Sequence, residues 1–100
     1  MDIVITVEGI TGHCPVYRKG DRIVLDDGYR LDPGETSGCC MHSLAALMPF
    51  YNALAKGVSP EELGLGHKDE GEGDKAWIQC PDPCEETDGG TALFSVTRVE

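Results

Sequence analysis

Basic residues are scarce in this chain, and their scarcity limits the partners that it can bind. The 100 residues include 8 Lys and Arg against 18 Asp and Glu, which gives a formal net charge of −10. Nucleic acids and anionic membrane surfaces are bound through patches of Lys and Arg. We therefore expect neither as a partner. The charge balance leaves open a larger, basic protein partner such as an enzyme, and a homo-oligomer.

Long apolar runs and a secretory signal are also missing. No apolar stretch approaches the roughly 20 residues of a membrane-spanning helix. The first residues, 1–3, lead directly into a strand pattern without a basic segment before it. We therefore expect a cytoplasmic protein whose thiols stay reduced. The phosphate-binding glycine loop, the Gly-x-Ser-x-Gly elbow and the dinucleotide fingerprint are absent from the sequence as well. We favour an accessory, non-catalytic role and keep an enzymatic one as the alternative.

The hydrophobic pattern predicts one α+β domain over residues 1–100. Apolar residues that alternate with polar ones, and short β-branched runs, predict strands. These strands cover residues 3–8, 22–25, 29–31, 76–79 and 92–99. Gly9 to Gly12 should end the first strand, and Asp26-Asp27-Gly28 should form a tight hairpin connection. We expect residues 67–75, which are charged and rich in glycine, to form a flexible acidic loop.

One main helix is predicted from about Cys39 to Lys56, with Gly57 as its stop. Thr36 or Ser37 should supply the N-terminal cap. Steps of three and four place a single apolar face on this helix, formed by Cys40, Leu44, Leu47, Tyr51 and Leu54. Pro49 should kink the helix or begin a second one. Residues 59–62, Ser-Pro-Glu-Glu, predict a short second helix. The expected fold is a small antiparallel sheet packed against one proline-kinked helix.

The five cysteines are the strongest chemical signal in the sequence. In a cytosolic chain, several cysteines favour metal binding over disulfides. Cys80 and Cys84 have a spacing that zinc sites use, and two prolines stiffen the segment between them. A zinc ribbon needs a second such pair, which the sequence lacks. We therefore hypothesise that Cys14, Cys40, Cys80 and Cys84 converge near the helix N-terminus and bind Zn²⁺ or an iron–sulfur centre. Weaker candidate ligands are Cys39, His42 and His13.

Two alternatives remain open at this point. In the first, Cys39 or Cys40 is the reactive thiol of an enzyme or redox protein, because a helix start favours a thiolate. Cys40 also lies on the apolar helix face, so packing is the simpler interpretation of that residue. In the second alternative, the chain is an acidic protein-interaction module whose cysteines only fill space, as free cysteines often do.

Three blocks of sequence occur in a familiar order. Cys14 precedes Lys19-Gly20-Asp21, residues 38–54 contain Gly-Cys-Cys-Met-His-Ser-Leu and then Pro49, and Cys80-Pro81-Asp82 precedes the last strand. This order resembles a family of small prokaryotic proteins, frequent in anaerobes, for which no activity is established. The family has a cysteine before a Gly-Asp turn, a Cys-Pro that opens a proline-containing helix, and a late cysteine before the final strand. The resemblance implies functional positions at Cys14, Cys40 and Cys80. Met41 stands where the family has proline, and Cys39 and Cys84 are additions.

Overall fold

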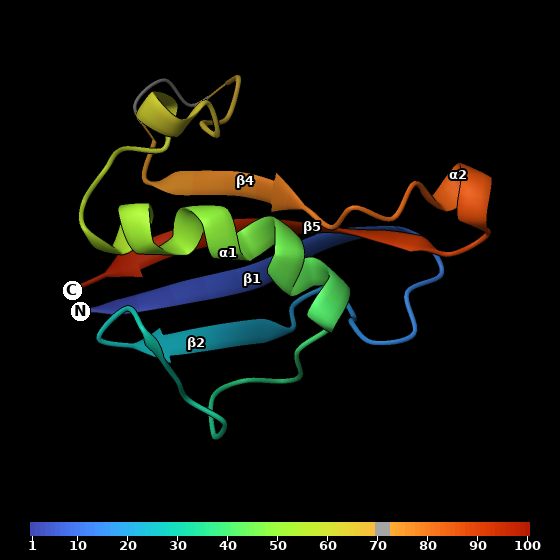
Figure 1. Ribbon diagram of the computed structural model, residues 1–100, viewed down its shortest axis with the longest axis horizontal. Helices are drawn as coiled ribbons and strands as arrows, with labels where there is room; N and C mark the ends of the chain where they lie inside the picture. Colours follow the sequence, from blue (N-terminus) through green and yellow to red (C-terminus); the bar gives the residue numbers. More distant parts are fainter. Residues whose placement is uncertain (70–72) are drawn as a thin grey trace.

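A five-stranded antiparallel sheet lies beneath one main helix in the computed structural model of the chain, which describes residues 1–69 and 73–100 (Figure 1). The strands are β1 (Asp2–Gly12), β2 (Arg22–Asp26), β3 (Arg30–Leu31), β4 (Lys75–Gln79) and β5 (Gly90–Val99), in the order β3-β2-β1-β5-β4. The helices are α1 (Met41–Ala55), the 3-10 helix η1 (Glu61–Leu63) and the short α2 (Cys84–Thr87). The predicted α+β class, with an antiparallel sheet, one main helix and a short second helix, is confirmed. Among the described residues, no helix combines the length and the apolarity that crossing a membrane requires.

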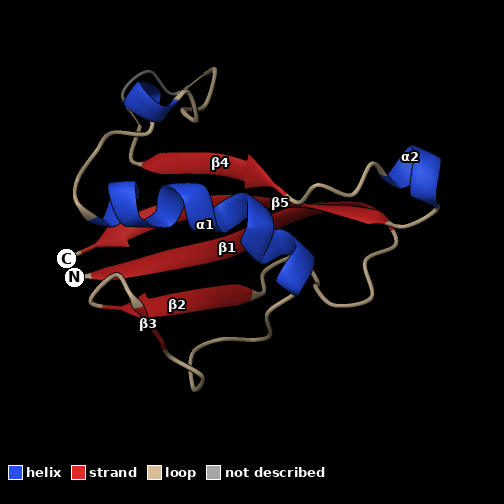
Figure 2. Cartoon of the chain, in the orientation of Figure 1, coloured by secondary structure: helices blue, strands red, loops and turns tan. Residues whose placement is uncertain are grey.

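The core lies between α1 and the central strands (Figure 2). Alternate residues of β1 point to the helix, and Ile3, Ile5 and Val7 are all at most 3% exposed. Phe94 and Val96 of β5 cover the same side of the sheet. The fully buried aromatic and aliphatic side chains each contribute about 1.5–3 kcal/mol to folding. The alternation of buried and partly exposed residues along the strands therefore determines which face of the sheet packs against α1.

β1 and β5 form a longer pair than the sequence predicts. The expected break at Gly9 to Gly12 is wrong, because β1 runs through a β-bulge between Val7 and Gly9 and stays paired as far as Gly12, opposite Gly90. A bulge absorbs one extra residue without ending the ladder. The two strands consequently extend past the N-terminal end of α1, as Figure 1 shows. Cys14 follows the extended part of β1, and Cys84 lies in the segment that leads into the extended part of β5.

The β2–β3 hairpin turns at the predicted residues. Asp27 and Gly28 both have positive φ, 56° and 83°, which is the signature of a type I′ turn. Gly28 also packs closely under α1, since a Cβ at this position would lie 2.9 Å from the Cβ of Ala55. Glycine is therefore required here for both its backbone conformation and its size.

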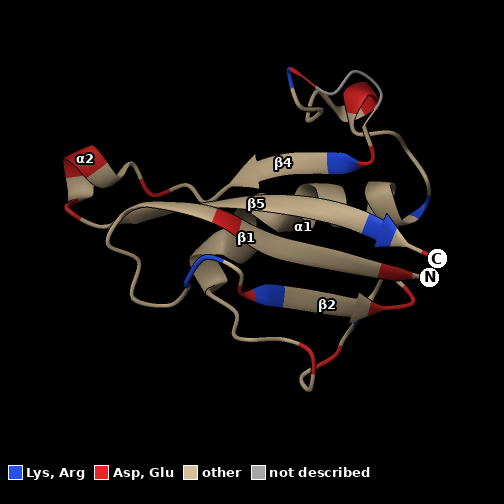
Figure 3. Ribbon diagram, turned by 180° about the vertical axis from the view of Figure 1, so that it is seen from behind, with Lys and Arg blue, Asp and Glu red and all other residues tan. Residues whose placement is uncertain are grey.

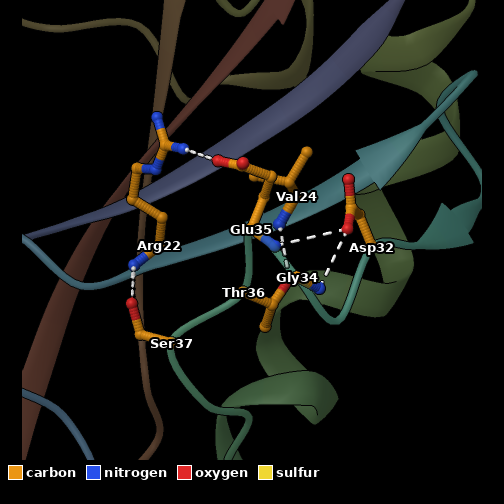
Figure 4. A network of polar contacts seen from close by, with 7 residues as sticks. All are labelled: Arg22, Val24, Asp32, Gly34, Glu35, Thr36 and Ser37. Atoms are coloured by element: carbon orange, nitrogen blue, oxygen red, sulfur yellow. Dashed lines mark hydrogen bonds and ion pairs between the residues drawn. The ribbon is translucent and has the colours of Figure 1, made fainter.

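The segment of residues 32–37 lies along β2 and does not cap α1 (Figure 4). The Thr36 hydroxyl accepts a hydrogen bond from the Val24 N–H at 3.1 Å, and the Ser37 hydroxyl accepts one from the Arg22 N–H at 3.1 Å. An ion pair of 2.7 Å joins Arg22 to Glu35. The prediction that Thr36 or Ser37 caps the helix is thus wrong, because both hydroxyls satisfy N–H groups of β2. The N-cap position belongs to Cys40.

Helix α1 continues through Pro49 and ends where expected. Gly57 follows it with φ 90°, and Gly57 N–H donates to the carbonyl of Leu54. The predicted second helix is present as η1, and the Ser59 hydroxyl accepts a hydrogen bond from the Glu62 N–H at 3.3 Å. The separate helix α2 is not among the elements predicted from the sequence.

The predicted acidic loop before β4 is only partly covered by the structure. The expected acidic loop of residues 67–75 includes residues 70–72, which lie outside the described part of the chain. Its last residue, Lys75, is the first of β4, and its ammonium lies 3.7 Å from a Glu8 carboxylate oxygen across the sheet. Seen from the side opposite α1, the charged residues gather mainly at strand ends and in the connecting segments (Figure 3).

Candidate functional site

Three of the five cysteines line one cavity of about 260 Å³, which we call the cysteine cavity. Cys14 follows β1, Cys40 directly precedes α1, and Cys80 directly follows β4. These residues are 26 or more positions apart along the chain. Figure 1 shows why they meet, since the ends of β1 and β4 lie on the same side of the molecule as the start of α1. His42 and Asp82 are also among the residues that line this cavity.

Glycines allow the Cys14 segment to close against β5. The His13 N–H donates to the Gly89 carbonyl at 2.9 Å. A Cβ on Gly90 would lie 2.5 Å from the His13 carbonyl carbon and 2.6 Å from the Cys14 nitrogen. Gly12 has φ 78°, and a Cβ there would collide with the Gly89 carbonyl oxygen. Backbone thus packs directly on backbone, which draws Cys14 toward the strand that pairs with β4.

Backbone N–H groups hold two of the three sulfur atoms. The Tyr17 N–H donates to Cys14 Sγ at 3.3 Å, three residues along the chain. The Ala92 N–H donates to Cys80 Sγ at 3.2 Å, and the Cys80 thiol lies 3.7 Å from the Gly90 carbonyl oxygen. Cys80 is 7% exposed, whereas Cys14 is half-buried. N–H donors of this kind stabilise negative charge on sulfur and surround metal-bound cysteines.

The start of α1 places a positive dipole end beside the cavity. Cys40 is the N-cap with extended backbone angles, φ −89° and ψ 128°, and no side chain caps the first turn. The first turn carries no acidic residue either. The first N–H groups of a helix have no acceptor within it, and aligned peptide dipoles make this end attractive to anions. Cys40, His42 and Ser43 bring this end to the cavity wall.

The remaining candidate residues lie apart from the three cysteines. Cys39 is exposed and lines a separate apolar groove of about 300 Å³ between α1 and the β2–β3 hairpin. Partial desolvation of its thiol, and then the charge of a neighbouring Cys40 thiolate, raise the pKa of Cys39, which disfavours the thiolate that a nucleophile needs. Cys84, on α2, borders a different surface hollow. His13 is exposed beside Cys14 and does not line the cavity.

The described residues do not form a ready-made binding site for a single metal ion. Within residues 1–69 and 73–100, no three His, Cys, Asp or Glu side chains are grouped closely enough to hold one metal ion. A tetrahedral zinc site needs each sulfur about 2.3 Å from one point. The three cysteines wall a cavity instead of meeting at its centre.

Tyr17 also belongs to this site, although it is not among the residues that the sequence singles out. It is 4% exposed, and its hydroxyl accepts a hydrogen bond from the Cys40 N–H at 2.7 Å. Its ring packs edge-on against Phe94 with 5.5 Å between centroids. The available signal was its position three residues after Cys14, which permits an N–H···S hydrogen bond. The contact with Cys40, 23 residues away, follows only from the tertiary fold.

No protein-family model, curated protein or solved structure matches this chain.

Proposed function

We propose that this chain is a small accessory protein that binds a thiophilic metal centre through Cys14, Cys40 and Cys80. The observation that carries the proposal is the convergence of these cysteines, from three distant segments, on one cavity. Soft thiolate ligands select zinc, copper(I) and iron–sulfur clusters. Cys84 is left out of the ligand set because it borders another hollow.

The surroundings of the three sulfurs support a thiolate site. Cys14 and Cys80 each accept a hydrogen bond from a backbone N–H. Cys40 lies at a helix start that no capping side chain or acidic residue neutralises. Binding a dication through three thiolates leaves a net negative charge, which these N–H groups and the dipole offset. Simple packing of cysteines as small apolar side chains requires none of these donors.

Between the two metal centres that the sequence suggests, the cavity favours an iron–sulfur centre over a single zinc ion. Cluster-bound cysteines surround a group of several atoms, so their sulfurs need not meet at one point. Three thiolates leave one coordination position for a further ligand, and His42 and Asp82 line the same cavity. Zinc would require the three sulfurs to move together on binding.

Metal and sulfide analysis of protein purified without oxygen tests the proposal. We expect near-stoichiometric metal in the wild-type chain. Iron with acid-labile sulfide and visible absorption identifies a cluster, whereas zinc without colour identifies a single-ion site. Protein that is fully folded but takes up neither zinc nor iron and sulfide on reconstitution would overturn the proposal.

Single cysteine variants assign the ligands. Cys14→Ser, Cys40→Ser and Cys80→Ser should each lose the centre, while Cys39→Ser and Cys84→Ser should retain it. The last two are matched controls because they change the same chemical group outside the cavity. Circular dichroism checks that each variant is folded, and Cys80→Ala replaces Cys80→Ser if the buried hydroxyl prevents folding. Equal metal content in all five serine variants would contradict the assignment.

A further inference from the structure

Tyr17 makes hydrogen bonds to two of the three cysteines that line the cavity. Its backbone N–H donates to Cys14 Sγ at 3.3 Å, and its hydroxyl accepts the Cys40 N–H at 2.7 Å. Cys14 and Cys40 are 26 residues apart in the chain. One residue therefore connects the segment after β1 to the start of α1.

The hydroxyl of Tyr17 belongs to a closed ring of hydrogen bonds whose direction can be assigned. The Ser43 hydroxyl donates to the Cys40 carbonyl at 2.7 Å. A serine hydroxyl has one hydrogen, so the 2.7 Å contact between Tyr17 and Ser43 has Tyr17 as its donor. The ring then runs from Cys40 N–H to Tyr17, from Tyr17 to Ser43, and from Ser43 back to the Cys40 carbonyl.

This ring fixes both backbone polar groups of Cys40. The Leu44 N–H adds a helical hydrogen bond of 3.2 Å to the same carbonyl. With the N–H and the carbonyl of Cys40 both held, the direction of its Cα–Cβ bond is set. Ser43 is fully buried and Tyr17 is 4% exposed. Removing one hydroxyl from the ring therefore costs free energy, because water cannot freely take its place.

The geometry points to Tyr17 as the positioning residue of the cysteine cavity, with Ser43 as its partner in holding the backbone of Cys40, and so the direction of its Cα–Cβ bond, in place relative to Cys14. Neither hydroxyl is needed as a ligand. Phe94, which packs against the Tyr17 ring and is fully buried in β5, ties this arrangement to the sheet that leads to Cys80. What the cysteines bind rests on the proposed function, whereas the positioning itself does not.

Alkylation of individual cysteines, measured by mass spectrometry on the metal-free full chain, tests the positioning. Tyr17→Phe removes only the hydroxyl and keeps the ring and the N–H···S bond. We expect Cys40 to alkylate roughly fivefold faster, the factor that one hydrogen bond represents. The rate of Cys80 should stay within error. Tyr51→Phe is the matched control, since Tyr51 lies on α1 and lines the apolar groove instead.

Ser43→Ala is the second variant, and it should have the same selective effect on Cys40 with Tyr17 intact. A merely structural role would accelerate all five cysteines together, including buried Cys80. Uniform acceleration, or an unchanged Cys40 rate in both variants, would overturn the inference. If Tyr17→Phe fails to fold, Ser43→Ala decides by itself.

Zinc titration against a chromophoric chelator gives an independent readout. Loss of a residue that orients a metal ligand weakens metal binding about 10- to 100-fold. We expect that loss in Tyr17→Phe and not in Tyr51→Phe. A wild-type chain that binds neither zinc nor reconstituted iron and sulfide defeats the proposed function, and the alkylation contrast then still decides the positioning. A wild-type chain that binds metal, with identical affinities in both tyrosine variants, defeats the positioning alone.

Discussion

Substitution of Gly90 by alanine tests whether backbone-to-backbone packing sets the position of Cys14. A Cβ at residue 90 would lie 2.5 Å from the His13 carbonyl carbon, 2.7 Å from the His13 oxygen and 2.6 Å from the Cys14 nitrogen. All three atoms belong to the backbone, so no rotamer change can relieve the contact. The His13–Cys14 segment must move away from β5, and the wall of the cysteine cavity must open.

The size of the effect follows from two opposing terms. Overpacking a close-packed site costs about 1–3 kcal/mol. Replacing glycine by alanine where the backbone allows it returns about 0.4–1 kcal/mol through the unfolded state. We expect Gly90→Ala to lose about 1–2 kcal/mol of unfolding free energy. For a domain of this size, that loss lowers Tm by roughly 5–15 °C.

Gly38→Ala is the matched control for this experiment. A Cβ at residue 38 meets nothing within 4 Å, and no positive φ opposes it. Urea unfolding of both variants gives the free energies, and alkylation of Cys14 in the native state reports the opening of the cavity wall. If Gly90→Ala unfolds at the same urea concentration as Gly38→Ala with an unchanged Cys14 rate, the close approach does not hold Cys14 and the reasoning fails.

Three further substitutions test the helix start and two titrating groups. Met41→Pro should raise Tm, because proline suits the first helical position and Cys40 before it is already extended; a lower Tm would show that the Met41 N–H is needed. Desolvation, and then the Asp32 carboxylate, raise the pKa of Asp26. The charged carboxylate of Asp26 therefore destabilises the folded state above the ordinary aspartate pKa. Asp26→Asn should raise the urea midpoint of unfolding at pH 7 but not at pH 3, where the carboxyl group is protonated. Equal increases in the midpoint at both pH values would refute this. Burial raises the pKa of Tyr17, so its contribution to stability is complete below the ordinary tyrosine pKa and is lost as pH rises through the raised value. Tyr17→Phe should flatten this alkaline loss in unfolding measurements above pH 10, and parallel curves would contradict the assignment.

Much of the fold can be predicted because local patterns and tertiary packing agree. Alternation over residues 3–7 identifies the core face of β1, and Asp27-Gly28 specifies a type I′ turn through its positive φ angles. Gly57 ends α1 for the same backbone reason. In each case one physical constraint acts within a few residues of the position that reveals it.

The wrong predictions share a different cause, which is competition from distant groups. Thr36 and Ser37 have the chemistry of helix caps, but the N–H groups of β2 take their hydroxyls. Gly9 looks like a strand end, yet pairing with β5 carries β1 through a bulge. Helix α2 spans four residues, 84–87, too few for a helical period to appear in the sequence.

The candidate site likewise contains residues that the sequence indicates and residues whose role depends on distant contacts. The cysteine pattern names Cys14, Cys40, Cys80 and Cys84, and the first three of these line the cavity. The spacing of Cys80 and Cys84 does not indicate that Cys84 borders a different hollow, because its position depends on the direction in which the chain leaves β4. Tyr17 is invisible for a similar reason, since its hydroxyl acts on a residue 23 positions away.

Packing alone accounts for Cys80 but leaves features of Cys14 and Cys40 unexplained. Cys80 is 7% exposed and belongs to the core cluster, so a small apolar side chain would serve there. Cys14 and Cys40 are half-buried at the cavity wall and pack against the edge of the core. Nevertheless Cys14 accepts an N–H hydrogen bond, and a buried ring that includes Tyr17 holds the backbone of Cys40. These polar contacts at two half-buried cysteines support the proposed ligand-binding site over inert filling.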